Sequence, residues 1–150
     1  MGYYSDVKLL VSKEGYRELK EYVVKEGLKF KKPEDEYDYN MIRIADSIKT
    51  DGDQVLISWD SIKWYDGYYH DVDIIIHGIE HLSAEGYSYR FYRVGESYDD
   101  MEVAEHDGDL DQDLDYLDVV RAIDDSRFSS YEISWDAFDE SNLKKKEGEE

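Results

Sequence analysis

The residues from Glu96 to Asp118, ESYDDMEVAEHDGDLDQDLDYLD, limit what this chain can fold into and bind more than any other stretch. Eleven of these 23 residues are acidic and none is Lys or Arg. From Asp107 to Asp115 an Asp stands at every second position, so an extended chain would place these carboxylates on one side, ~6.6–6.8 Å apart. So much like charge destabilises a compact state by self-repulsion. The stretch is therefore either solvated surface or a surface that binds a partner.

The composition of the whole chain limits the kinds of protein it can be. A chain of 150 residues fits one domain, which would bury roughly 68–70% of its unfolded surface. Its 41% hydrophobic and 15% aromatic residues distinguish it from disordered acidic tails, because such tails contain few aromatics. With 38 acidic against 18 basic residues, the formal charge is −20. This charge argues against binding nucleic acid or an anionic membrane and favours a basic partner.

Three absences in the sequence predict a cytoplasmic protein. There are no cysteines, which excludes disulfides and is typical of reducing compartments. The opening MGYYSDVKLL lacks the basic region and apolar run of a signal peptide. The sequence contains no run of about 18 apolar residues, so no transmembrane helix is expected.

Residues 1–95 alternate between strand patterns and helix patterns. Helices are predicted over 13–26 and 71–85, where apolar residues recur at helical spacing. The order of elements, βαββαβ, predicts an α+β fold: a ferredoxin-like antiparallel sheet with two helices on one face. Strands are predicted where apolar side chains alternate, at Val7, Leu9 and Val11; at Ile42, Ile44 and Ile48; at Val55, Ile57 and Trp59; and over 87–94, with Tyr87, Tyr89 and Phe91 on one face.

Local signals predict where these elements begin and end. Ser12 is a suitable N-cap for the first helix, and Gly27 stands where a C′ residue ends one. Asp51-Gly52 predicts a hairpin turn, because both residues tolerate the positive φ of a type I′ turn.

The periodicity is weaker after Gly95. Residues 101–104 fit a short strand and residues 107–115 a loop. Leu114, Leu117, Val120 and Arg121 fit a helix, but residues 117–123 fit a strand equally well. We expect three parts, listed by range: an α+β core, 1–95; an acidic extension packed on the same single domain, 96–143; and a frayed tail, 144–150.

The sequence His77-Gly78-Ile79-Glu80-His81 matches H-x-x-E-H, in which two His hold Zn²⁺ and the Glu is a general base. On the predicted helix, however, His77 and His81 lie opposite the apolar face and point to solvent. A catalytic zinc ion needs a sheltered cleft and a third ligand. We interpret the two histidines as surface residues and expect no metal.

Other signatures of chemistry are incomplete or absent. The alternating aspartates have the spacing of a calcium loop, but an EF-hand needs Gly and Glu where this chain has Gln112 and Asp118. The aromatic residues of 87–94 would suit RNA stacking, but the RNP pattern is missing and the charge opposes phosphate. Nucleotide-binding glycine loops, a cysteine nucleophile and Gly-x-Ser-x-Gly are also absent. We therefore expect neither an enzyme nor a cofactor.

The acids and tyrosines of the acidic stretch remain as the candidate binding surface. A merely solubilising coat would spread its acids evenly, whereas residues 1–33 carry +3 and residues 34–150 carry −23. Tyr is enriched at protein interfaces, and carboxylates at phosphate-like spacing are what a DNA mimic needs. Replacing the five alternating aspartates with Asn is expected to preserve or raise the stability of the fold. The predicted partner-binding residues are Glu96, Tyr98, Asp99, Asp100, Glu102, Glu105, Asp107, Asp109, Asp111, Asp113, Asp115, Tyr116 and Asp118.

Two stretches, MGYYSDVKLLVSKEGYRELKEYV and GYSYRFYRVGESYDD, resemble a group of small phage-encoded proteins. The charge, the size and the absence of cysteines are also similar to those of phage anti-defence inhibitors, including anti-CRISPR proteins. The resemblance implies a non-enzymatic inhibitor in the cytoplasm of a bacterial host, which contacts neither nucleic acid nor membrane. Its expected partner is the basic nucleic-acid-binding channel of a host protein, first a CRISPR effector nuclease and second a restriction enzyme. The alternative is a soluble phage or prophage interaction or regulatory module without DNA mimicry.

Overall fold

The computed structural model describes residues 2–65, 67, 69–111, 114–117, 119, 123, 125, 128 and 131–136. Two predicted partner-binding residues, Asp113 and Asp118, lie outside these residues, as do Gln112 and the predicted tail.

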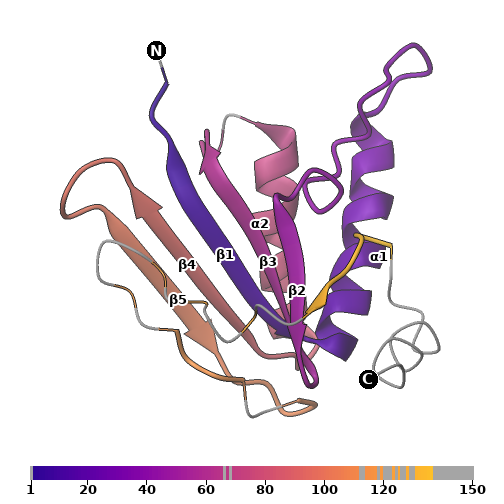
Figure 1. The fold of residues 1–150 in the computed structure, drawn as a ribbon. Helices are drawn as coiled ribbons and strands as arrows, with labels where there is room; N and C mark the ends of the chain where they lie inside the picture. Colours follow the sequence, from indigo (N-terminus) through magenta and orange to yellow (C-terminus); the bar gives the residue numbers. More distant parts are fainter. Residues whose placement is uncertain are drawn as a thin grey trace.

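One antiparallel sheet with two helices on one of its faces forms the fold (Figure 1). The strand order is β5-β4-β1-β3-β2-β6. The predicted α+β class is therefore confirmed, but the sheet differs from the predicted ferredoxin-like pattern because β5 and β6 extend it at its two edges. The elements are β1 (Ser5–Ser12), α1 (Lys13–Phe30), β2 (Ser47–Asp51), β3 (Gln54–Ile62), α2 (His70–Ala84), β4 (Tyr89–Gly95), β5 (Met101–His106) and β6 (Tyr131–Glu132).

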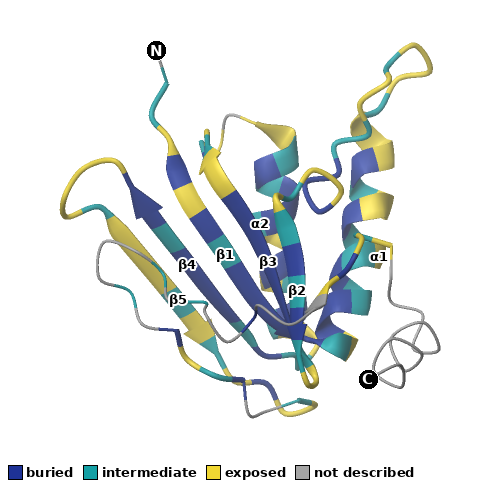
Figure 2. Ribbon diagram, viewed as in Figure 1, coloured by how far each residue is buried: buried dark blue, intermediate teal, exposed yellow. Residues whose placement is uncertain are grey.

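The main core lies between the helices and the sheet. The alternation predicted for β1 is confirmed, since Val7, Leu9 and Val11 are fully buried against the helices. Ser12 is the predicted N-cap of α1, and its hydroxyl accepts a hydrogen bond from the Gly15 amide at 2.9 Å. The buried residues of β1, β3 and β4 appear dark blue in Figure 2.

The helix α1 continues to Phe30 instead of ending before Gly27. Gly27 is buried within the helix, where a Cβ atom would lie 2.5 Å from the Asp38 carbonyl oxygen. This glycine therefore permits a close approach of the chain that follows the helix. The prediction that it ends the helix is wrong, because close packing and helix termination both favour glycine.

The predicted strand around Ile42, Ile44 and Ile48 is only partly correct, because β2 begins at Ser47. The Asn40 side chain accepts hydrogen bonds from the amides of Ile42 and Arg43. These hydrogen bonds hold the residues before β2 in a turn. As a result Ile42 is buried while Ile44 is about half exposed. The hairpin itself is confirmed, although its two loop residues are 52–53, one position later than predicted.

A second, smaller core lies on the sheet face opposite the helices. Leu10, Leu56 and Tyr92 are buried there on β1, β3 and β4. Leu114 and Leu117, from the predicted acidic extension, pack against them together with Phe128. Part of the acidic stretch therefore supplies apolar side chains to the domain.

Candidate interaction surface

The strand β5 is the last strand of the sheet on one side and carries much of the acidic stretch. It pairs with β4 from Met101 opposite Val94 to His106 opposite Tyr89. Four of its six residues are exposed, among them Glu102 and Glu105. Figure 2 shows this strand as mostly exposed, in contrast to its neighbour β4. Carboxylates on an edge strand also oppose pairing with another chain.

Arg93 of β4 holds the beginning of the acidic stretch. Its guanidinium donates hydrogen bonds to both carboxylate oxygens of Asp100, at 2.8 and 3.1 Å, and its Nε donates to Glu102 at 3.0 Å. The hydrogen bond with Asp100 raises the pKa of Arg93 above its usual range. The Tyr3 hydroxyl also donates to Asp100 at 2.6 Å. These contacts fix the turn between β4 and β5.

Arg90, three residues earlier on β4, holds the chain that follows β5 on the opposite face of the sheet. Its guanidinium donates to the His106 carbonyl at 3.0 Å, to the Leu114 carbonyl at 3.3 Å and to the Asp107 carboxylate at 2.5 Å. It also lies over the ring of Tyr116, 4.3 Å from its centroid. One buried cation thus connects both ends of the loop after β5.

Asp111 and Asp115 also turn toward the domain. The Asp111 carboxylate accepts hydrogen bonds from the Ser88 amide at 2.5 Å and from the Ser12 hydroxyl. The Asp115 carboxylate accepts from the Gln54 side chain at 2.7 Å. Of the alternating aspartates that the structure describes, Asp107 and Asp109 are exposed, whereas Asp111 and Asp115 are only partly exposed, so these four do not form the single exposed row that an extended chain would give.

Several of the predicted residues do face outward. Asp99 and Asp109 are exposed, as is Glu96, which accepts a hydrogen bond from the Tyr4 amide. Tyr98 is 82% exposed, the most of any large hydrophobic residue in the described part of the chain. The exposed acids and Tyr98 follow β5 and the segments on either side of it. We call this surface the β5 edge and define it as Glu96, Tyr98, Asp99, Glu102, Glu105, Asp107 and Asp109.

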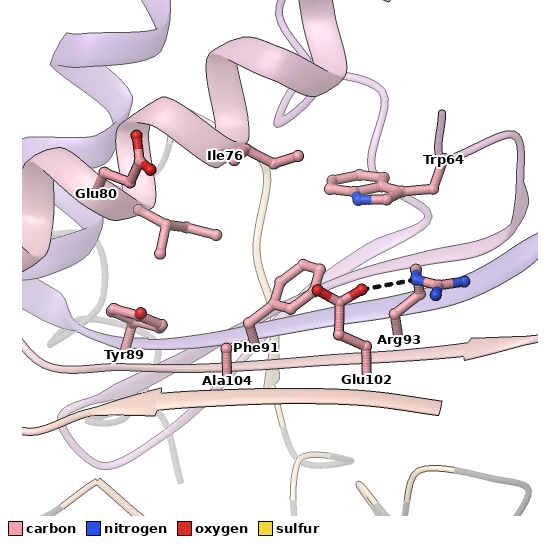
Figure 3. Close-up of a pocket in the computed structure, with 9 residues that line it drawn as sticks. Trp64, Ile76, Glu80, Tyr89, Phe91, Arg93, Glu102 and Ala104 are labelled. Atoms are coloured by element: carbon pink, nitrogen blue, oxygen red, sulfur yellow. Dashed lines mark hydrogen bonds and ion pairs between the residues drawn. The ribbon is translucent and has the colours of Figure 1, made fainter. Parts of the chain in front are cut away.

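A pocket of about 370 Å³ opens between α2 and the β4–β5 pair (Figure 3). Its walls combine aromatic and aliphatic side chains with three charged residues. It adjoins the β5 edge, because Glu102 belongs to both. The lining residues are Trp64, Ile76, Ile79, Glu80, Tyr89, Phe91, Arg93, Glu102 and Ala104. The sequence did not predict this pocket, since its residues come from segments with no shared motif.

The two histidines of the H-x-x-E-H sequence differ in their surroundings. His77 is exposed, as predicted. His81 is partly buried between the helices, where its ring stacks on Tyr22 with centroids 5.0 Å apart and its Nε2 lies 2.7 Å from Glu18. Within the described ranges, no group of three or more His, Cys, Asp or Glu residues has a geometry suited to a metal ion.

No protein family, curated protein or solved structure matches this chain. No helix among the described residues combines the length and the apolar character needed to cross a membrane.

Proposed function

We propose that this protein is a non-enzymatic, phage-type inhibitor that occupies the basic nucleic-acid-binding channel of a host defence protein. The β5 edge would lie in the channel where DNA otherwise binds. A CRISPR effector nuclease is the first candidate target and a restriction enzyme the second.

The observation that carries this proposal is the arrangement of charge across β4 and β5. The side chain of Arg90 is only 2% exposed, whereas its partner Asp107 is 55% exposed. Likewise Arg93 is 17% exposed and its partner Glu102 54%. The cations that position these acids are covered, and the carboxylates face solvent. A partner approaching the β5 edge would therefore meet negative charge, even though ion pairs are present.

The spacing of the exposed acids is compatible with a basic channel. Glu102 and Glu105 lie three residues apart on β5, ~10 Å along an extended strand. This is about three times the ~3.4 Å axial spacing of phosphates along one DNA strand. The exposed acids of the β5 edge could therefore satisfy some of the phosphate-binding sites of a channel, and the net charge of −20 would speed association.

We also propose that β1 to β4 with α1 and α2 form a ferredoxin-like core. In chain order these elements follow βαββαβ, and β4-β1-β3-β2 are consecutive in the sheet. The strands β5 and β6 would then be additions at its two edges, with the acidic surface built on the first.

The alternative, an interaction or regulatory module without mimicry, is favoured by a different surface. The outer face of α1 has a largely apolar groove with exposed Val24 and Leu28, flanked by Arg17 and Lys20. A partner of that groove would not need to be basic.

The test compares two triple variants that remove the same charge. Asp99→Asn, Glu105→Gln and Asp109→Asn alter the β5 edge, whereas Glu34→Gln, Glu36→Gln and Glu132→Gln alter exposed acids elsewhere. Binding to a purified CRISPR effector nuclease is measured at several salt concentrations, with and without competing duplex DNA.

We expect the β5-edge variant to bind about tenfold more weakly at low salt, since each exposed charge contributes up to ~1 kcal/mol. DNA should compete with the wild-type protein, and its affinity should fall as salt rises. Equal effects of the two variants, together with no competition by DNA, would refute mimicry and favour the alternative module.

A further inference from the structure

We propose that the pocket between α2 and the β4–β5 pair binds the guanidinium group of an arginine side chain from the partner protein. The source of the arginine rests on the proposed function, because a basic channel bound at the β5 edge would present such side chains beside the pocket.

The pocket has two aromatic walls at one end and a third aromatic ring at the other. The rings of Trp64 and Phe91 lie with centroids 6.0 Å apart at an interplanar angle of 39°. Figure 3 shows Tyr89 across the pocket floor from Trp64, with Ile76 above. Aromatic faces attract cations through the ring quadrupole, and aliphatic walls accommodate the methylene stem of a long side chain.

The charged groups at the rim are mostly negative. Glu80 is exposed on α2, and Glu102 extends from β5 on the other side (Figure 3). Arg93 is the one cation among the lining residues, and its guanidinium is hydrogen-bonded to Asp100 and Glu102. Burial, and secondly the Glu80 carboxylate, raise the pKa of Tyr89. An anionic ligand would be repelled by these carboxylates and by the whole molecule.

Guanidinium fits this lining better than an ammonium or a neutral group. It is planar, so it stacks on aromatic faces while its N–H groups point outward to carboxylates. It is also more weakly hydrated than an ammonium and loses less on entering an apolar site. The pair Arg93–Glu102 already shows, on this same surface, a guanidinium donating to a carboxylate at 3.0 Å.

The position of the pocket connects it with the β5 edge. Glu102 lines the pocket and belongs to the edge, and Ala104 lines it two residues later on the same strand. An arginine entering the pocket would therefore lie beside Glu102, one of the carboxylates that would attract the rest of a basic channel. Such a side chain would be an anchor for the complex, since Arg in a desolvated aromatic pocket is a common binding hot spot.

The test uses three acetylated and amidated peptides, Gly-Gly-X-Gly-Gly, in which X is arginine, citrulline or lysine. Citrulline has the shape of arginine without its charge, and lysine has the charge without the planar group. Each peptide is titrated into the ¹⁵N-labelled full chain and followed by NMR at low salt. We expect the arginine peptide to shift the signals of Phe91, Ala104 and the Trp64 indole. It should bind about threefold more tightly than the lysine peptide. Citrulline should cause no such shifts.

Matched variants show whether the pocket itself is responsible. Glu80→Gln should weaken arginine binding about threefold to fivefold. Glu85→Gln, at the exposed C-cap of the same helix and outside the pocket, should not. Ala104→Leu fills the pocket without changing the charge and should abolish the shifts. Equal binding of arginine and citrulline, or equal weakening by both Gln variants, would overturn the proposal.

These titrations need no target, so they fail independently of the proposed function. If the pocket binds the arginine peptide but DNA does not compete for the target, the pocket proposal stands and the mimicry proposal fails. If DNA competes but the arginine peptide does not bind, the mimicry proposal stands and the pocket proposal fails.

Discussion

Replacing Asp111 with alanine should destabilise the fold, although it removes one negative charge from a chain with a net charge of −20. Asp111 connects the beginning of β4 with the N-cap of α1. Its carboxylate accepts from the buried Ser88 amide at 2.5 Å and from the hydroxyl of Ser12, which in turn caps the Gly15 amide. Without it, these buried donors lose their acceptor.

The magnitude follows from the groups left without a partner. Ser88 is fully buried, and an unsatisfied buried amide costs ~1–3 kcal/mol. The lost hydrogen bond from Ser12 adds ~1 kcal/mol. Relief of repulsion between exposed charges offsets less than ~0.5 kcal/mol. We therefore expect a net loss of ~1.5–4 kcal/mol in the free energy of unfolding.

Urea unfolding followed by circular dichroism measures this loss, and Asp109→Ala is its control. The two variants have the same charge and lie two residues apart, but Asp109 is exposed. In thermal unfolding, the melting temperature of a chain of this size should fall by roughly 5–15 °C in Asp111→Ala. It should hardly change in the control. Equal stability of the two variants would refute the structural role. It would then support the expectation, drawn from the sequence, that neutralising these aspartates does not weaken the fold.

Two further predictions concern aromatic contacts. His81→Ala should lower the free energy of unfolding by ~1 kcal/mol through loss of the stack on Tyr22. His77→Ala should change it by less than ~0.5 kcal/mol. Chemical unfolding of both variants measures the two changes, and equal losses would contradict a stabilising role of the stack. Burial, and secondly Asp136, raise the pKa of Tyr16, so the folded form keeps a proton that the unfolded chain loses above pH ~10. Stability should thus be complete below pH ~10 and fall above it, and urea unfolding at pH 9 and 11 should show a smaller fall for Tyr16→Phe.

The sequence predicted those parts of the fold that depend on local patterns. The alternation in β1 and the capping by Ser12 need only neighbouring residues, and both are confirmed. The same is true of α2, predicted over 71–85 and observed over His70–Ala84. Short-range periodicity and capping chemistry were sufficient in these places.

Long-range contacts account for the differences. Gly27 has the composition of a helix end, but its role depends on Asp38, which the helix pattern does not include. The inward turn of Asp111 depends on Ser12 and Ser88, which are far from it in sequence. A run of acids looks the same whether its carboxylates face water or buried donors. The sequence alone therefore does not reveal that Asp111 and Asp115 turn inward.

The pairing of β4 with β5 explains how one stretch can stabilise the fold and still present negative charge. Arg90 and Arg93 lie on opposite faces of β4, because their positions differ by an odd number of residues. In the observed register Glu102 lies opposite Arg93, and Glu105 lies opposite Arg90. Opposite charges at facing positions stabilise a strand pair. A slip by one residue would exchange the faces of β5 and place Glu102 beside apolar neighbours. The two arginines therefore favour this register, which keeps the carboxylates of Glu102 and Glu105 exposed at the outer edge of the sheet.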